Sequence, residues 1–149
     1  MKTDIRQIDS GEDEIIIRYK ELTPGIKRIL DALNFSSTRI VGRKDENRVV
    51  IDGDDILYFE SVDDRTFVYT ENDVLRVDYT LQGIISTLRD ERFFRCSKSM
   101  IINVDKVKLL KSMSSNRIDA TLENGEHILI SRAYASDFRR LLKGGEDRG

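Results

Sequence analysis

The sequence predicts a mostly β domain with a few short helices, preceded by a short β-α extension, and three observations support this fold class. From residue 37 onward, the apolar residues come in short runs rich in β-branched and aromatic side chains, separated by charged or Asn-Gly turns. Apolar residues at helical spacing are confined to three short segments, around residues 24–33, 81–88 and 131–142. The 149 residues suffice for one domain with its own core plus a short extension.

Residues 1–44 are predicted to form the extension. Glu14–Tyr19 is the expected strand, because three consecutive isoleucines in it are β-branched. A helix should follow, with Thr23 as its N-cap and Pro24 at its first position. The apolar side chains of this helix share one stripe, made of Leu22, Ile26, Ile29, Leu30 and Leu33. This stripe either packs onto the neighbouring sheet or serves dimerisation or partner docking.

The strands expected after the extension helix are separated by charged turns. The expected strands are Ser37–Val41, Arg48–Ile51, Ile56–Glu60, Phe67–Tyr69 and Val74–Tyr79. The charged segment 42–47 should join the first two strands as a hairpin. A turn over residues 63–66 should join the third strand to the fourth. Short strands at this spacing indicate an all-β core.

Two further helices and a hairpin are expected in the second half. Thr80 should cap a brief helix whose apolar face holds Leu81, Ile84, Ile85 and Leu88. Strands around Val107–Leu110 and over Ile118–Leu122 and His127–Ile130 follow, and Asn124-Gly125 predicts a type I′ turn between the last two. Ser131 should begin a terminal helix with Tyr134, Phe138, Leu141 and Leu142 on one face. Gly144-Gly145 is expected to stop this helix before a charged tail, residues 144–149.

Charge is distributed unevenly along the chain. The whole sequence carries a net charge of -2, yet residues 1–80 hold 12 Lys and Arg against 18 Asp and Glu, whereas residues 81–149 hold 13 against 9. Phosphate binding depends on a local positive face, so the overall acidity does not exclude a nucleic-acid partner. No run approaches 18 apolar residues and the N-terminus leads into no signal-peptide pattern, so the protein is expected to be cytoplasmic.

Catalytic and metal-binding chemistry is poorly supported by the residue types present. His127 and Cys96 are the only histidine and the only cysteine, so they cannot form a Cys/His zinc site or an internal disulfide. The acidic pairs fall in expected turns, and no glycine-rich phosphate loop is present. We therefore expect no enzyme activity, cofactor, metal or small-molecule substrate. Cys96 beside Arg95 and Lys98 is either an oxidant-responsive thiol with a lowered pKa or a buried strand residue.

A polar island lies between two apolar runs of the second half. Ser97, Lys98 and Ser99 each offer a hydrogen-bond donor, and they separate Phe93-Phe94 from Met100-Ile101-Ile102. This pattern predicts two strands joined by an accessible tip. On local chemistry the tip is either an ordinary hairpin loop or a place where the fold holds a ligand.

Three segments, "DDILYFES", "DERFFRCSKSMIINVDKV" and "ATLENGEHILISRAY", occur in this order within residues 45–143. With their separations, they resemble the LytTR family of bacterial DNA-binding domains. The resemblance implies an elongated antiparallel sheet domain that binds duplex DNA through loops and strand ends placed in successive major grooves. It covers most of the chain, and its middle segment is the most specific of the three.

The DNA contacts that the resemblance implies come from three separated segments. These residues are Arg65 and Thr66, Ser97, Lys98 and Ser99, and Arg132. Lys98 would reach a phosphate or guanine, and Arg132 would engage guanine with two hydrogen bonds. The family commonly has histidine at the position of Ser97 and often a second arginine at that of Ala133, so direct base readout differs there. Asn103 also matches the family motif, but its place after an apolar strand indicates that it fastens a turn.

The resemblance also implies a mode of action. It predicts a stand-alone transcriptional regulator, a homodimer on paired sites, with a small membrane protein as a regulatory partner. The roughly 45 residues before the matched region are too few for a receiver domain. Two alternatives remain at this point: a protein-interaction module that uses the extension and sheet edges, and a redox-responsive regulator that uses Cys96.

Overall fold

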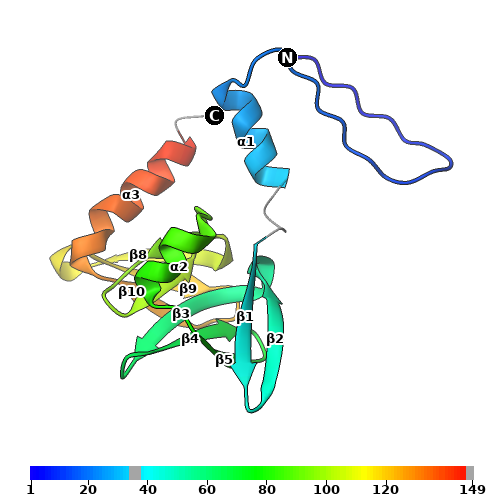
Figure 1. The fold of residues 1–149 in the computed structure, drawn as a ribbon. Coiled ribbons are helices and arrows are strands. Elements are labelled where there is room, and N and C mark those ends of the chain that lie inside the picture. The colour runs from blue at the N-terminus through cyan, green and yellow to red at the C-terminus, as the bar shows by residue number, and fades with distance from the viewer. Residues whose placement is uncertain (34–37, 147–149) are drawn as a thin grey trace. The chain divides into compact units, whose positions relative to one another are not determined.

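The computed structural model describes residues 1–33 and 38–146, and it divides the chain into two compact units, Met1–Ala32 and Leu33–Gly149. Figure 1 labels their helices and most of their strands. No described helix is both long enough and apolar enough to span a bilayer.

The first unit contains the predicted helix but not the predicted strand. Helix α1 (Pro24–Leu33) begins where expected, and the Thr23 Oγ1 atom accepts the N–H of Ile26 at 3.3 Å. The prediction of a strand over Glu14–Tyr19 is wrong: no described residue before α1 belongs to a strand. Ile15 and Ile16 are 73% and 64% exposed. A β-branched run forms a strand only when a neighbour pairs with its backbone groups, and this segment has no paired strand.

In the part of the chain that the structure describes, the second unit holds two antiparallel sheets, two α-helices and three short 3-10 helices. Strands β1 (Arg39–Lys44), β2 (Asn47–Asp52), β3 (Ile56–Val62), β4 (Arg65–Thr70), β5 (Val74–Val77), β6 (Phe93–Arg95) and β7 (Met100–Asn103) form the larger sheet, in the order β2-β1-β5-β4-β3-β7-β6. Strands β8 (Val107–Met113), β9 (Arg117–Leu122) and β10 (His127–Ile130) form the smaller sheet, in the order β10-β9-β8. Helix α2 (Leu81–Leu88) precedes β6, and α3 (Arg132–Glu146) follows β10. The mostly β fold class is confirmed.

The expected strands of the first half are present, but their turns are shorter than predicted. Residues 45–46 alone join β1 to β2, and Ser37 lies outside the described residues. The turn expected over residues 63–66 contains only Asp63 and Asp64, because Val62 pairs directly with Arg65. Both aspartates have a positive φ, 51° and 61°, as a two-residue type I′ turn requires. Arg65 and Thr66 therefore belong to strand β4.

The β9–β10 hairpin is confirmed, but its type I′ turn is wrong. Of Asn124 and Gly125, only the glycine has a positive φ, 90°. The Leu122 carbonyl accepts the N–H of Gly125 at 2.9 Å, and the Asn124 Oδ1 atom accepts the N–H of Glu126 at 3.1 Å. Asparagine here bonds its own backbone two residues on, so a longer loop with a single left-handed residue replaces the two-residue turn.

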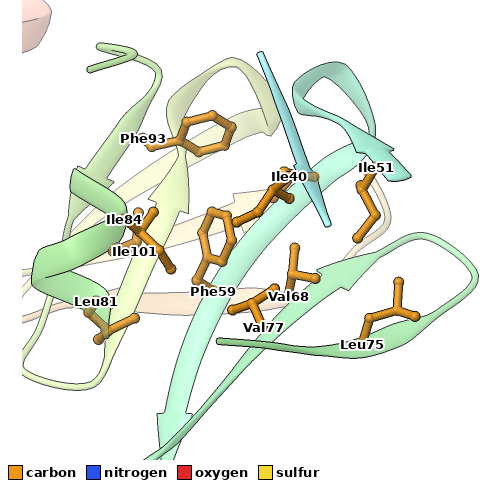
Figure 2. Packing of buried hydrophobic residues seen from close by; sticks show 11 residues of the cluster. Ile40, Ile51, Phe59, Val68, Leu75, Val77, Leu81, Ile84, Phe93 and Ile101 are labelled. Carbon is orange, nitrogen blue, oxygen red and sulfur yellow. The ribbon is translucent and has the colours of Figure 1, made fainter. Parts of the chain in front are cut away.

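Two buried clusters lie on opposite faces of the central strands. The first, shown in Figure 2, combines the larger sheet with α2 and includes Phe59, Val68, Leu81, Ile84, Phe93 and Ile101. The second combines Leu57, Tyr58 and Ile102 of the larger sheet with the smaller sheet and α3, and it includes Cys96, Ile118, Leu122, Ile130, Ala135 and Phe138. Neighbouring residues of β7 thus enter different cores, because successive side chains of a strand point to opposite faces.

The capping predictions for the two helices have different outcomes. Thr80 caps α2 as expected, since its Oγ1 atom accepts the N–H of Gly83 at 3.0 Å. The prediction that Gly144-Gly145 stops the terminal helix is wrong, because α3 continues to Glu146. Glycine lowers helix stability by about 1 kcal/mol relative to alanine but keeps its backbone N–H, so it does not force a helix to end.

Candidate nucleic-acid interface

The predicted polar tip is the loop between β6 and β7, residues 96–99, called the 96–99 loop below. It is closed by a hydrogen bond from the Cys96 N–H to the Met100 carbonyl, 3.1 Å long. Inside it, the Ser97 Oγ atom accepts the N–H of Ser99 at 3.3 Å. Lys98 and Ser99 are exposed and Ser97 is half-buried. The loop therefore presents an ammonium group and two hydroxyl groups on a backbone held by its flanking strands.

Two backbone hydrogen bonds attach the 96–99 loop to distant parts of the chain. The Ser61 N–H donates to the Ser99 carbonyl at 2.8 Å, and the Ser131 N–H donates to the Cys96 carbonyl at 2.9 Å. Ser61 lies near the end of β3, and Ser131 directly precedes α3. The loop is thus held between the end of one strand and the beginning of the last helix.

These contacts bring the three predicted segments to one end of the domain. Ser61 pairs with Thr66 across the β3–β4 hairpin. Arg65 directly precedes Thr66 and pairs with Val62, the residue after Ser61, so it lies one strand position from the contact with the loop. Arg132 is the residue after Ser131 and opens α3. Arg65, Lys98 and Arg132 are exposed, whereas Thr66 is buried with 5% of its surface exposed.

The three exposed cations at this end have no carboxylate partner. The side chains of Arg65, Lys98 and Arg132 form no ion pair with any residue in the described part of the chain, whereas Arg43 and Lys44 of β1 pair with Asp78 and Asp73. A surface cation without an ion-pair partner is available to an external anion. The arrangement can therefore bind phosphates, and its hydroxyl and guanidinium donors can reach base edges.

Arg95 is a residue of this site that the sequence interpretation missed. Its Nε atom donates to the Ser97 carbonyl at 2.8 Å, and its Nη2 atom donates to the Lys98 carbonyl at 2.6 Å. Its side chain thus binds the backbone of the 96–99 loop. The only signal in the sequence is an arginine placed directly before the loop.

Asn103 fastens a turn, as predicted, and takes no part in this surface. It is fully buried; its Nδ2 atom donates to the Ile56 carbonyl at 2.7 Å and its Oδ1 atom accepts the N–H of Asp105 at 3.0 Å. These bonds hold the short turn Val104–Lys106 against the start of β3. His127 is a surface residue, with its Nδ1 atom 2.9 Å from the Asp119 carboxylate.

Cys96 is a buried core residue, which decides between the two roles considered for it. Its side chain is fully buried in the second cluster, and burial raises the pKa of its thiol to about 12 although Arg95 acts in the opposite direction. Burial disfavours the thiolate, which is the form that reacts with oxidants. The redox interpretation therefore loses its chemical basis.

We predict that native Cys96 reacts slowly with iodoacetamide. A pKa of about 12 leaves about one thiol in 10,000 ionised at pH 8, against roughly a quarter for an ordinary cysteine. Alkylation should be slow in buffer, should accelerate as the pH rises, and should become fast when urea unfolds the chain. Equal rates for native and unfolded protein, followed by mass spectrometry, would contradict the burial of this thiol.

The comparison with known proteins agrees with the fold of the second unit. The family model for the LytTr DNA-binding domain matches residues 46–143. The chain belongs to this family. The solved structure of the LytTr DNA-binding domain of a putative methyl-accepting/DNA response regulator from Bacillus cereus matches with a TM-score of 0.67 and 28% identity, covering 70% of this chain and 96% of that chain.

Curated relatives of this LytTR chain include transcriptional regulators. The transcriptional regulatory protein YpdB of Escherichia coli (strain K12) is 29% identical over 100 residues, which are 66% of this chain and 41% of that protein. The sensory transduction protein LytT of Bacillus subtilis (strain 168) is 29% identical over 97 residues, 65% of this chain and 40% of that protein. The chain thus spans about two fifths of the length of these relatives. Residues 46–143 form a DNA-binding domain.

Proposed function

We propose that this protein is a transcriptional regulator that binds specific sequences in duplex DNA by inserting loops and strand ends into major grooves. The observation that supports this most is the attachment of the 96–99 loop to both β3 and the start of α3. It gathers Arg65, Lys98 and Arg132, which are far apart in the sequence, at one end of a LytTR domain. One rigid surface can then contact several phosphates and base edges together.

The proposed contacts divide into positioning and reading. Lys98 is assigned to a phosphate and the hydroxyls of Ser97 and Ser99 to phosphate or base atoms, because ammonium and hydroxyl donors fit either. Arg132 is assigned to guanine, whose O6 and N7 atoms match the fork of a guanidinium group. Arg65 completes the cationic surface. Thr66 is left out of these contacts because its side chain is buried.

Binding as a dimer on paired sites is the second part of the proposal. Of the predicted apolar stripe, Leu22 lies just before α1 and is 60% exposed, and Leu33 at the end of α1 is 43% exposed, so these two side chains are available to a second copy. Ile26 is buried and is left out of this proposed contact. Sedimentation at micromolar concentration should therefore give the mass of a dimer. A monomer under these conditions would remove this part of the proposal and leave the DNA contacts unaffected.

Location and regulation belong to the same proposal. A regulator that acts on chromosomal DNA works in the bacterial cytoplasm. A small membrane protein as its regulatory partner remains the input that the family resemblance implies.

The test of the function is a selection of bound duplexes from a random DNA pool, followed by gel shifts over a range of salt concentrations. The logarithm of the affinity should fall linearly with the logarithm of the salt concentration, with a slope of about -0.9 for each phosphate contacted. A selected duplex should bind at least about a thousandfold more tightly than an unrelated one. The absence of both effects would favour the protein-interaction module instead.

A further inference from the structure

Arg95 occupies a special place in the candidate interface, because its guanidinium group binds the loop backbone. It is the last residue of β6, and its two donors reach the carbonyl groups of Ser97 and Lys98, at 2.8 and 2.6 Å. Hydrogen bonds from a charged donor are shorter and stronger than those between neutral groups. The arginine thus holds two consecutive peptide units of the loop.

Holding these two peptide units fixes the backbone at Lys98. The Ser97 carbonyl belongs to the planar peptide unit before the Lys98 Cα atom, and the Lys98 carbonyl belongs to the unit after it. Since each peptide unit is rigid, fixing both planes fixes φ and ψ of Lys98 and with them the direction in which its side chain leaves the loop. The same contacts turn two carbonyl dipoles toward a cation and so reduce their repulsion of a phosphate.

The two backbone bonds that join the 96–99 loop to distant segments act at its ends. The Ser131 N–H holds Cys96, and the Ser61 N–H holds Ser99. These two contacts locate the loop relative to β3 and α3. Arg95 acts on the residues between them, including the residue that carries the ammonium group.

We propose that Arg95 is a positioning residue for DNA recognition: it sets the backbone of the 96–99 loop so that Ser97, Lys98 and Ser99 meet the duplex in one conformation. It does this through its bonds to the loop backbone, without contacting DNA itself. This inference rests on the proposed function. As a consequence, Arg95 mainly affects the ratio of the affinities for a specific site and for unrelated DNA. It has less effect on the electrostatic attraction that acts on all DNA.

The test compares Arg95→Lys with wild type on a selected duplex and on an unrelated duplex. Lysine keeps the charge, but its single ammonium group on a flexible stem does not reproduce the planar fork that holds two carbonyls. The ratio of the two affinities should fall about tenfold, as expected from the loss of one charge-assisted hydrogen bond. The salt slope should equal that of wild type, because no phosphate contact is lost.

Arg48→Lys is the matched control, since Arg48 is exposed on β2, the strand at the far edge of the larger sheet. It should leave both the affinity ratio and the salt slope unchanged. An unchanged ratio for Arg95→Lys would overturn the inference, as would an equal loss on both duplexes with a reduced salt slope, which would make Arg95 a phosphate contact. If wild type shows neither salt dependence nor sequence preference, the proposed function itself is wrong.

A measurement on the wild-type protein avoids the question of whether the variant folds. The Nε–H of Arg95 should exchange with solvent much more slowly than that of Arg48 in NMR spectra of the free protein, and it should stay protected when the selected duplex is added. Exchange as fast as that of Arg48 in the free protein would overturn the inference. Loss of protection on DNA addition would also do so, because a positioning residue keeps its bonds in the complex.

Discussion

Replacing Arg132 by alanine should abolish most of the preference at one base pair of the selected site. A guanidinium group that binds guanine with two hydrogen bonds contributes about 1–3 kcal/mol of discrimination against another base. Affinity for the selected duplex should therefore fall roughly 5- to 150-fold, while affinity for a duplex already changed at that base pair should fall little. The measurement is a set of gel shifts with wild type and variant on every single-base-pair change of the site.

Arg140→Ala is the control for this prediction. Arg140 is exposed on the same helix and pairs with Asp137. Its replacement also removes one positive charge, but about two turns further along α3 than Arg132. The base preference should survive in this variant. If Arg132→Ala keeps the wild-type preference at every base pair, Arg132 does not read the sequence and the contact assignment is wrong.

Replacing Lys98 by alanine should weaken binding to all duplexes by a similar factor. Lys98 is exposed at the middle of the 96–99 loop and has no carboxylate partner in the described part of the chain, so its charge is available to a phosphate. Loss of one phosphate contact should make the salt slope less steep by about 0.9. The measurement is the affinity for selected and unrelated duplexes at several salt concentrations.

Lys108→Ala provides the control, because Lys108 is an exposed lysine far from the 96–99 loop. It follows Val107, which pairs with Leu122 at one end of the small sheet, whereas Ser131 follows β10 at the other end. The salt slope of Lys108→Ala should equal that of wild type. If Lys98→Ala lost only the preference at one base pair and kept its affinity for unrelated duplexes, Lys98 would contact a base edge. That result would contradict its assignment to a phosphate.

Most elements of the domain could be predicted from the sequence because their signals are local. Thr23 and Thr80 precede helices whose apolar residues repeat every three to four positions, and both cap as expected. Short β-branched and aromatic runs such as Ile56–Val62 form strands because they also have partners in the sheet. The same composition at Ile15 and Ile16 gives no strand, since a partner is not a local property.

The candidate site shows the same division. The exposure of Lys98 between two strands followed from its polar neighbours, and the family resemblance supplied the other segments. The burial of Thr66 did not follow, because it depends on a turn of only two residues that moves Thr66 into β4. The role of Arg95 did not follow either, since nothing in the sequence states where a long side chain finds its acceptors.

By itself, the sequence determined the mostly β class, the helix starts, the polar tip at residues 97–99 and the membership suggested by its three motifs, because each is encoded by residues that are neighbours in the chain. Only the tertiary structure decided that Cys96 is buried, that Arg95 holds the loop backbone and that Ser61 and Ser131 join three distant segments at one end. The physical reason is that burial and hydrogen bonding between distant segments depend on how the strands pair, and this pairing is settled by the whole core at once.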